Sequence, residues 1–185
     1  MGIPARERTL YEILESLPDG CTGEILAGTL HVNPRPSARH IRVGSKLGAR
    51  LDSPFDSGDD GPGGWWILDE PEVHFIVDVE LSVPDLAGWR RERMPKLPED
   101  HRFHVVPDWI CEIASPSTAG VDRTVKLPIY AAYGVRHVWL VDPVKRIIES
   151  LENVDGAWHA VGVAEGRIAL RLPPFDAVAV ASPWD

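Results

Sequence analysis

The sequence of 185 residues lacks several features that would define its class directly. It has only two cysteines, Cys21 and Cys111, and they lie far apart without metal-type spacing. This argues against a disulfide framework and a cysteine zinc site, and we expect a reducing compartment, the cytoplasm. No apolar run reaches the roughly 18 residues of a membrane span. The first residues carry no apolar signal region, so we expect neither membrane insertion nor secretion.

Motifs for nucleotide handling and for serine hydrolysis are also missing. The chain has no Gly-Lys-Ser/Thr phosphate loop and no Gly-x-Ser-x-Gly elbow, and residues 61–64 do not fit a dinucleotide fingerprint. His101 and His104 have chelating spacing, but no third ligand follows at a suitable distance. We therefore interpret this pair as part of a surface loop or of the start of a strand.

Positive charge is scarce, because 19 Lys and Arg face 28 Asp and Glu and give a net charge of −9. Such a chain repels polyanions on average, so a nucleic-acid function requires a local basic surface or a metal ion. Two local basic groups are present. They are Arg39, Arg42, Lys46 and Arg50 on one predicted helix face, and Arg90, Arg91, Arg93 and Lys96 further on. Each group is either a phosphate-binding surface or a solvated charged face.

The hydrophobic pattern predicts one domain over residues 1–185, with an α/β fold built on a mixed sheet. Helices are expected from Thr9, from about Ser37 to Leu51, and from an Asp122 cap to Gly134. Pro128 should kink or shorten the last helix. Residues 52–64 are expected to form a loop. Strands are expected at 24–26, 29–32, 65–68, 73–77, 83–86, 109–113 and 137–141, with later antiparallel strands near 147–148, 158–161 and 168–170.

Candidate chemistry lies on acidic residues. Glu112 stands within the apolar run 109–113, where a carboxylate is costly unless it is paired or bound to a metal. It is therefore either functional or paired with an arginine. Asp85 follows Val83-Pro84 on a predicted strand. Asp108 shares a strand face with Glu112, but a Pro-Asp pair is often only a turn.

Two further side chains could join these acids. Lys126, Tyr130 and Tyr133 share one helix face, so Lys126 reaches the carboxylates if that face packs against the Glu112 strand. The alternative is a solvated helical lysine. His40 falls on the apolar face of its helix, away from the basic stripe.

Four motifs follow one another along the chain. They are Val83-Pro84-Asp85-Leu86, the segment Pro107–Thr118, the pattern Asp122-x-x-x-Lys126-x-x-x-Tyr130 and the run from Gly134 to Pro143. Together they resemble the Uma-two family of restriction endonucleases, in the PD-(D/E)XK nuclease superfamily. The resemblance covers roughly residues 9–180. It implies a restriction-endonuclease-like core, a mixed sheet with helices on both faces.

The resemblance also implies a divalent metal, Mg²⁺ or Mn²⁺, held by Asp85 and Glu112. Glu24 would add a carboxylate, and Asp108 would be an extra ligand or a structural residue. The superfamily lysine normally stands at the position of Ala114, so Lys126 is the implied substitute. The same resemblance makes His40 either the group that orients a metal-bound water or a satisfied core histidine.

The expected function is metal-dependent hydrolysis of DNA phosphodiester bonds, with Lys126 assisting the water. One alternative is a catalytically inactive relative that keeps the fold for binding or oligomerisation, which the net charge and Ala114 favour. Another is a hydrolase that acts on a different phosphoester with the same site. Joint retention of Asp85, Glu112 and Lys126 favours the enzyme. By analogy with two-fold enzymes that cut duplex DNA, and from apolar strands and an expected Trp-rich surface, we also expect a homodimer.

Overall fold

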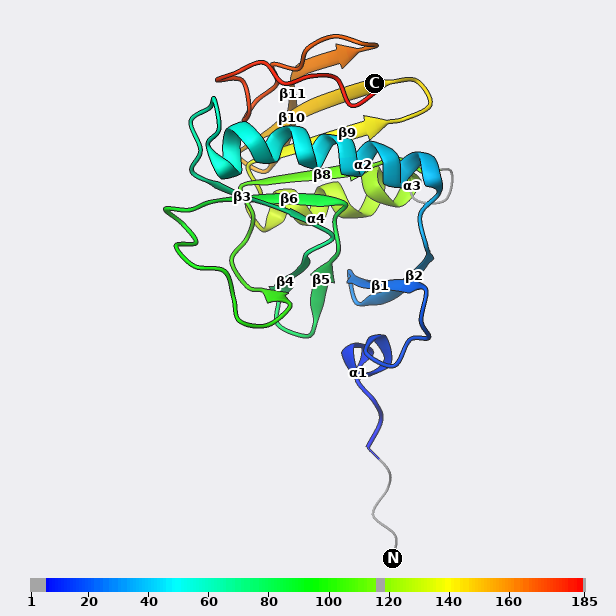
Figure 1. Cartoon of the computed structure of the whole chain (residues 1–185). Helices are drawn as coiled ribbons and strands as arrows, with labels where there is room; N and C mark the ends of the chain where they lie inside the picture. The colour runs from blue at the N-terminus through cyan, green and yellow to red at the C-terminus, as the bar shows by residue number, and fades with distance from the viewer. Residues whose placement is uncertain (1–5, 116–118, 185) are drawn as a thin grey trace, which may run out of the picture.

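The computed structural model describes residues 6–115 and 119–184, and its strands form two mixed sheets (Figure 1). One sheet has the order β2-β1-β5-β4-β7 and the other the order β11-β10-β9-β8-β6-β3. The strands of the first are β1 Cys21–Leu26, β2 Thr29–Pro34, β4 Glu72–Ile76, β5 Glu80–Ser82 and β7 Arg102–Phe103. Those of the second are β3 Trp65–Asp69, β6 Leu86–Arg90, β8 Trp109–Ile113, β9 His137–Asp142, β10 Ile147–Val154 and β11 Ala157–Glu165.

The helical segments are α1 Leu10–Leu14, α2 Ala38–Leu51, η1 Asp52–Ser57, α3 Ala119–Val121, η2 Asp122–Lys126 and α4 Leu127–Ala132. Thr9 and Glu12 close the predicted capping box of α1, and the Ser37 hydroxyl caps α2. None of the helices in the described ranges is long and apolar enough to cross a membrane. The predicted α/β class is confirmed.

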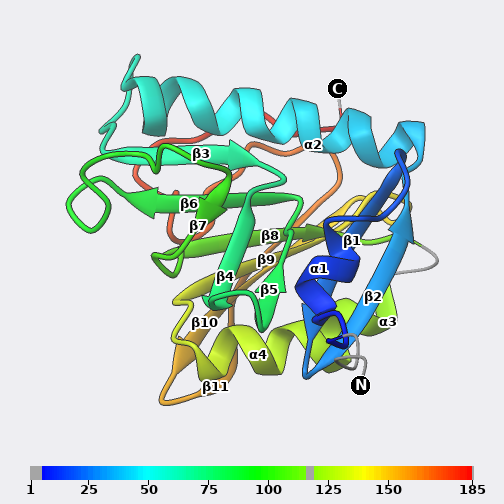
Figure 2. The same ribbon diagram turned by 90° about the horizontal axis from the view of Figure 1, so that it is seen from below.

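The strands β8 and β9 form the predicted parallel pair, with the helical segment 119–132 as their crossover. The side chains of β8 alternate between the two faces of the sheet. In Figure 2 the helices α2 and α4 lie on opposite sides of this sheet. Trp109, Cys111 and Ile113 belong to the core cluster that includes residues of α2, whereas Ile110 belongs to the cluster that includes residues of α4. Glu112 has the same parity as Ile110, so its carboxylate faces the crossover helix. Burial of both faces explains why this strand reads as a continuous apolar run.

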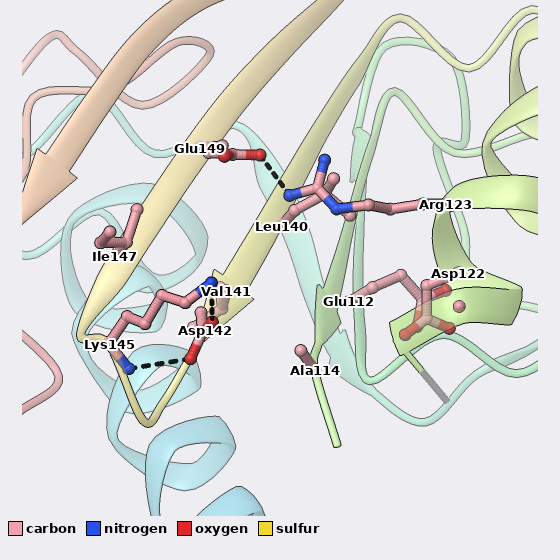
Figure 3. Close-up of a pocket in the computed structure, with 11 residues that line it drawn as sticks. Glu112, Ala114, Asp122, Arg123, Leu140, Val141, Asp142, Lys145, Ile147 and Glu149 are labelled. Atoms are coloured by element: carbon pink, nitrogen blue, oxygen red, sulfur yellow. Dashed lines mark hydrogen bonds and ion pairs between the residues drawn. The ribbon is translucent and has the colours of Figure 1, made fainter. Parts of the chain in front are cut away.

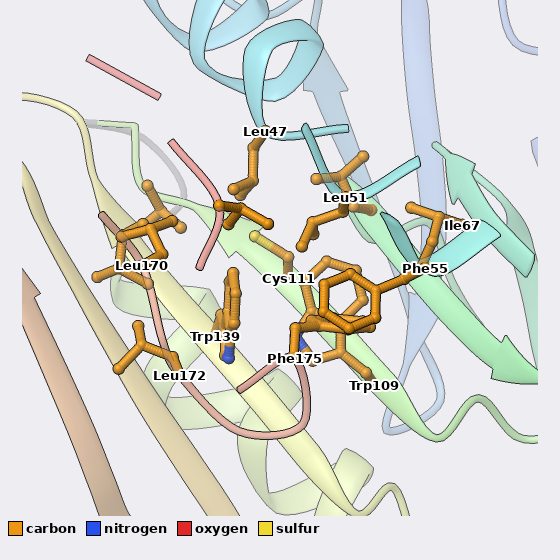
Figure 4. Close-up of a cluster of buried hydrophobic side chains, with 14 of the residues drawn as sticks. Leu47, Leu51, Phe55, Ile67, Trp109, Cys111, Trp139, Leu170, Leu172 and Phe175 are labelled. Atoms are coloured by element: carbon orange, nitrogen blue, oxygen red, sulfur yellow. The ribbon is translucent and has the colours of Figure 1, made fainter. Parts of the chain in front are cut away.

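The core beneath α2 is built around aromatic rings (Figure 4). Phe175 from the C-terminal segment is fully buried, and its ring lies 4.8 Å from Phe55 and 4.9 Å from Trp109. The prediction of a Trp-rich surface is wrong, because none of the described tryptophan side chains is exposed and four of them lie in the core. The large apolar area of an indole ring favours these interior positions.

The helix after β8 differs from its prediction at its start. Asp122 does not cap it, because the helix already includes Ala119, and the Asp122 carboxylate turns toward Lys126 instead. A π-helical turn covers Asp122–Lys126, closed by the Leu127 N–H, which donates to the Asp122 carbonyl. Pro128 then stands in the first turn of α4, where its missing N–H is tolerated. Gly134 ends the helix with φ 82°, as predicted.

Three other predictions need correction. The strand expected at 83–86 is absent, because β5 ends at Ser82 and Pro84 cannot donate to a ladder. The expected loop 52–64 begins with the π-helical turn η1, which buries Phe55. The strand expected at 168–170 is reduced to one bridge between Leu170 and Val180. Residues 116–118 of the Pro107–Thr118 motif lie outside the described residues.

Candidate active site

A buried ion cluster lies where β8 meets the crossover helix. The Lys126 ammonium lies 3.2 Å from Glu112 Oε1 and 2.9 Å from Glu24 Oε1. Asp122 Oδ1 lies 3.7 Å from the same nitrogen, one helical turn before it. All four side chains are almost fully buried. The predicted meeting of Lys126 with the carboxylates is therefore observed, and within the described ranges Glu112 pairs with this lysine and not with an arginine.

Two hydroxyl groups connect the carboxylates on the inner side of this cluster. Tyr130 donates its phenolic proton to Glu112 Oε1 at 2.5 Å, and its oxygen lies 2.8 Å from Ser82 Oγ. Ser82 donates to Glu24 Oε1 at 2.8 Å, and the Val83 N–H donates to the same oxygen. Both hydroxyls are fully buried. This chain fixes the positions of Glu24 and Glu112 relative to each other.

Asp85 lies beside the cluster at the entry to β6. Its Oδ2 accepts a hydrogen bond from the Ile113 N–H at 2.6 Å, which holds the carboxylate at the end of β8. Its Oδ1 lies 2.7 Å from His40 Nε2, contributed by α2. His40 is buried on the sheet-facing side of that helix, as predicted. The carboxyl end of β8 is therefore the place where three side chains meet: Asp85, Glu112 and His40.

The charge balance of the cluster sets its protonation. Burial raises the pKa of Glu112 well above its usual range, and nearby acids add to the rise, whereas Lys126 opposes it. Burial lowers the pKa of Lys126, but Glu112 and its other partners outweigh this and raise the pKa overall. Lys126 is thus held as an ammonium ion. For His40, burial also lowers the pKa, but the hydrogen bond to Asp85 produces a net rise.

Two clefts open on either side of Glu112 and Asp122. One has a volume of about 280 Å³ and is lined by Glu24, His40, Asp85 and Lys126 as well. The other, of about 320 Å³, lies between η2 and the end of β9, and Ala114 and Arg123 are on its wall (Figure 3). The two carboxylates are thus accessible from two directions despite their burial.

The donor atoms at this edge suit a hard divalent cation. Asp85, Glu24, Glu112 and Asp122 offer carboxylate oxygens, which Mg²⁺ and Mn²⁺ prefer. No group of three acidic, histidine or cysteine side chains within residues 6–115 and 119–184 is already arranged to hold an ion. Lys126 contacts three of the carboxylates at once. The carboxylate oxygens therefore fit a metal ion. In the metal-free protein the Lys126 ammonium supplies the positive charge that balances these carboxylates.

Other candidate residues lie elsewhere. Asp108 precedes β8, at the strand end opposite Ile113, and its Oδ1 pairs with Arg93 at 2.8 Å. Its Oδ2 accepts the backbone N–H of Arg90. These contacts give it a structural role in the described chain. His101 and His104 are both exposed and directly flank β7, in agreement with the predicted surface loop or strand start.

The predicted basic residues divide into two sets. Arg91 pairs with Asp56, and its guanidinium lies over the Trp66 ring, while that of Arg90 lies over Trp65. Lys46 and Arg50 are half-buried on α2. Arg39 and Arg42 are exposed on the first half of the same helix. Together with the exposed Lys96, the last two are predicted cations that form no ion pair with the described residues.

Sequence reasoning placed three contributors incompletely. Asp122 was interpreted as a cap, although its spacing of four from Lys126 is the signal for a helical ion pair. Tyr130 was placed on the correct helix face without a function. Ser82 carries no signal in the sequence, since its contact with Glu24 joins residues 58 positions apart.

The fold and this cluster define the class of protein: an α/β protein with a carboxylate–lysine site at the edge of a mixed sheet. The Uma2 family, described as "Putative restriction endonuclease", matches residues 9–181, and the chain belongs to this family. The chain is also similar to the crystal structure of "a putative nuclease belonging to DUF820" from Anabaena variabilis. That match has a TM-score of 0.75 and 19% identity, and it covers 96% of this chain and 97% of the other. A comparison with curated proteins gave no match.

Proposed function

We propose that this protein is a metal-dependent endonuclease that hydrolyses phosphodiester bonds of DNA. The observation that carries the proposal is the meeting at one cleft of Asp85 from the segment before β6, Glu112 from β8 and Lys126 from η2. An inert scaffold does not need a lysine and carboxylates buried together, because burial of charge is costly. Membership of a family described as restriction endonucleases gives independent support.

Asp85 and Glu112 would hold the metal, with Glu24 as a further oxygen donor. When bound, Mg²⁺ or Mn²⁺ would lower the pKa of water and neutralise negative charge on the phosphate. The Ile113 N–H and His40 fix the Asp85 carboxylate from two sides. Tyr130 fixes Glu112 in the same way. These contacts orient the ligands before any ion binds.

Lys126 has a defined role in this scheme. Despite its burial, its carboxylate partners raise its pKa, which favours the ammonium form in the metal-free protein. As an ammonium ion it would stabilise the negative charge that develops on the phosphate and hold water by donating a hydrogen bond. The lysine thus acts from the crossover helix, while Ala114 leaves the usual superfamily position without a charge.

The test compares wild type with Glu112→Gln, which keeps the shape of the side chain and removes its charge. Titration calorimetry with Mn²⁺ and Mg²⁺ should show binding by the wild type and none by the variant. Plasmid nicking should require the metal and should also vanish in the variant. Asp108→Asn is the matched control and should retain both activities. Wild-type metal binding without cleavage would leave the inactive binding module as the better interpretation.

The oligomeric state belongs to the same proposal. The symmetry of a two-fold dimer would place one active site at each strand of a DNA duplex. Light scattering of the purified protein measures this directly, and a monomer at working concentration would remove the dimer from the scheme.

A further inference from the structure

A basic hollow lies beside the catalytic edge. Its volume is about 360 Å³, and it is lined by Arg39 and Arg42 from α2, by Arg146 after β9, and by Pro143 and Trp184. Among the residues that the structure describes, no carboxylate lines it. Four other hollows in the described part of the chain each contain three or more carboxylates. In a protein of net charge −9, this concentration of positive charge is local and specific.

The three arginines are not used to stabilise the fold. Each is exposed, and none forms an ion pair or a side-chain hydrogen bond with the described residues. Arg39 and Arg42 are three apart on one helix, so their like charges repel each other. Arg146 adds a third positive charge from a different element. Such an arrangement gains stability only when an anion enters.

The hollow and the two clefts of the candidate active site are lined by neighbouring residues of the same two segments. Arg39 precedes His40, which lines the cleft around Asp85. Pro143 follows Asp142, which lines the cleft on the other side of Glu112. In Figure 3 the ribbon of α2 passes beside the turn that follows Asp142. A polymer bound in either cleft and extending across the start of α2 would reach the hollow.

We propose that Arg39, Arg42 and Arg146 bind backbone phosphates of the nucleic-acid strand next to the bond that is cut. This inference rests on the proposed function, because it places a flanking part of the same substrate. The contacts are to phosphate groups, so they position the strand without reading its sequence. They also explain how an acidic protein can hold a polyanion: attraction is confined to the surface that adjoins the cleft.

The experiment uses a fluorescein-labelled DNA duplex and fluorescence anisotropy at several salt concentrations. Ca²⁺ is present to neutralise the carboxylates, and the duplex is checked for integrity on a gel. Each neutralised phosphate contributes a slope of about 0.9 to the dependence of log affinity on log salt. Arg42→Gln and Arg146→Gln should each lower the slope by about that amount, on duplexes of unrelated sequence alike.

Two control variants make the result specific. Arg136→Gln removes the same charge at the opposite end of β9, where Arg136 pairs with Glu152 at 3.6 Å, and it should leave the slope unchanged. Arg42→Lys keeps the charge and should restore most of the slope. Because the hollow arginines are exposed, all variants should unfold at the wild-type temperature.

A wild-type slope in Arg42→Gln and Arg146→Gln would overturn the inference, as would equal losses in Arg136→Gln. Absence of duplex binding by the wild type would overturn it too. Mg²⁺ titration of the same variants keeps the two proposals apart. If the arginine variants bind metal normally and keep the wild-type slope, only the phosphate-binding role of the hollow is refuted. If the wild type binds no metal, the proposed function is refuted.

Discussion

Replacing Lys126 by methionine tests the buried ion cluster most directly. Methionine keeps most of the volume of the side chain and removes its charge. Glu24, Glu112 and Asp122 then face one another in the interior without a cation. Removing one partner of a buried ion pair costs about 3–5 kcal/mol, because the remaining charge stays uncompensated. For a chain of this size, that loss lowers the melting temperature by roughly 6–20 °C.

Urea unfolding followed by tryptophan fluorescence measures this loss. The control is Lys145→Met, because Lys145 is exposed and pairs with Asp142 at 3.4 Å on the surface. That variant should lose less than about 1 kcal/mol. Millimolar Mg²⁺ should stabilise Lys126→Met more than wild type, since a divalent ion can replace the missing charge. If the two variants lose the same small amount of stability, Lys126 does not compensate the buried carboxylates.

The loss should also depend on pH. The pKa of Glu112 in the folded state is raised, mainly by burial, and Lys126 is the group that opposes the rise. Without Lys126 the folded carboxyl binds its proton more tightly still, so the folded state gains stability as the pH falls toward the usual carboxyl pKa. The difference between wild type and Lys126→Met should therefore be larger at about pH 8 than at about pH 5.5. An equal difference at both values would contradict the assigned charges.

Three further results are expected. Tyr130→Phe removes the hydrogen bond to Glu112 and should lower the free energy of unfolding in urea by about 1–3 kcal/mol. It should also weaken Mn²⁺ binding about 10–100-fold by calorimetry, and unchanged affinity would show that the hydroxyl does not position Glu112 as a ligand. Phe175→Ala should cost about 3–5 kcal/mol, because the ring fills the aromatic core; a cost below about 1 kcal/mol would mean that the C-terminal segment does not stabilise the domain. With a thiol reagent at about pH 8, the exposed Cys21 should react in the native protein, and Cys111, whose pKa is raised by burial, only after unfolding.

Some of this structure follows from local sequence alone. The apolar spacing of Val43, Leu47 and Leu51 sets the buried face of α2 and so turns His40 inward and Arg39 outward. The run 109–113 between two prolines specifies a strand buried on both faces. Alternation along that strand then sends Glu112 to one face, and this makes it the most informative acid in the chain.

The tertiary structure decided which groups are partners. Nothing local indicates that Ser82 joins Glu24 to Tyr130. The helix face of Lys126 allows a meeting with carboxylates, but only the packing of the crossover helix against both sheets decides that it occurs. Asp108 and Glu112 share a strand face, yet the length of β8 separates them, and only Glu112 reaches the cleft. Sequence patterns fix periodicity and charge at each position, whereas burial, and with it the strength of electrostatic interactions, depends on what packs around that position.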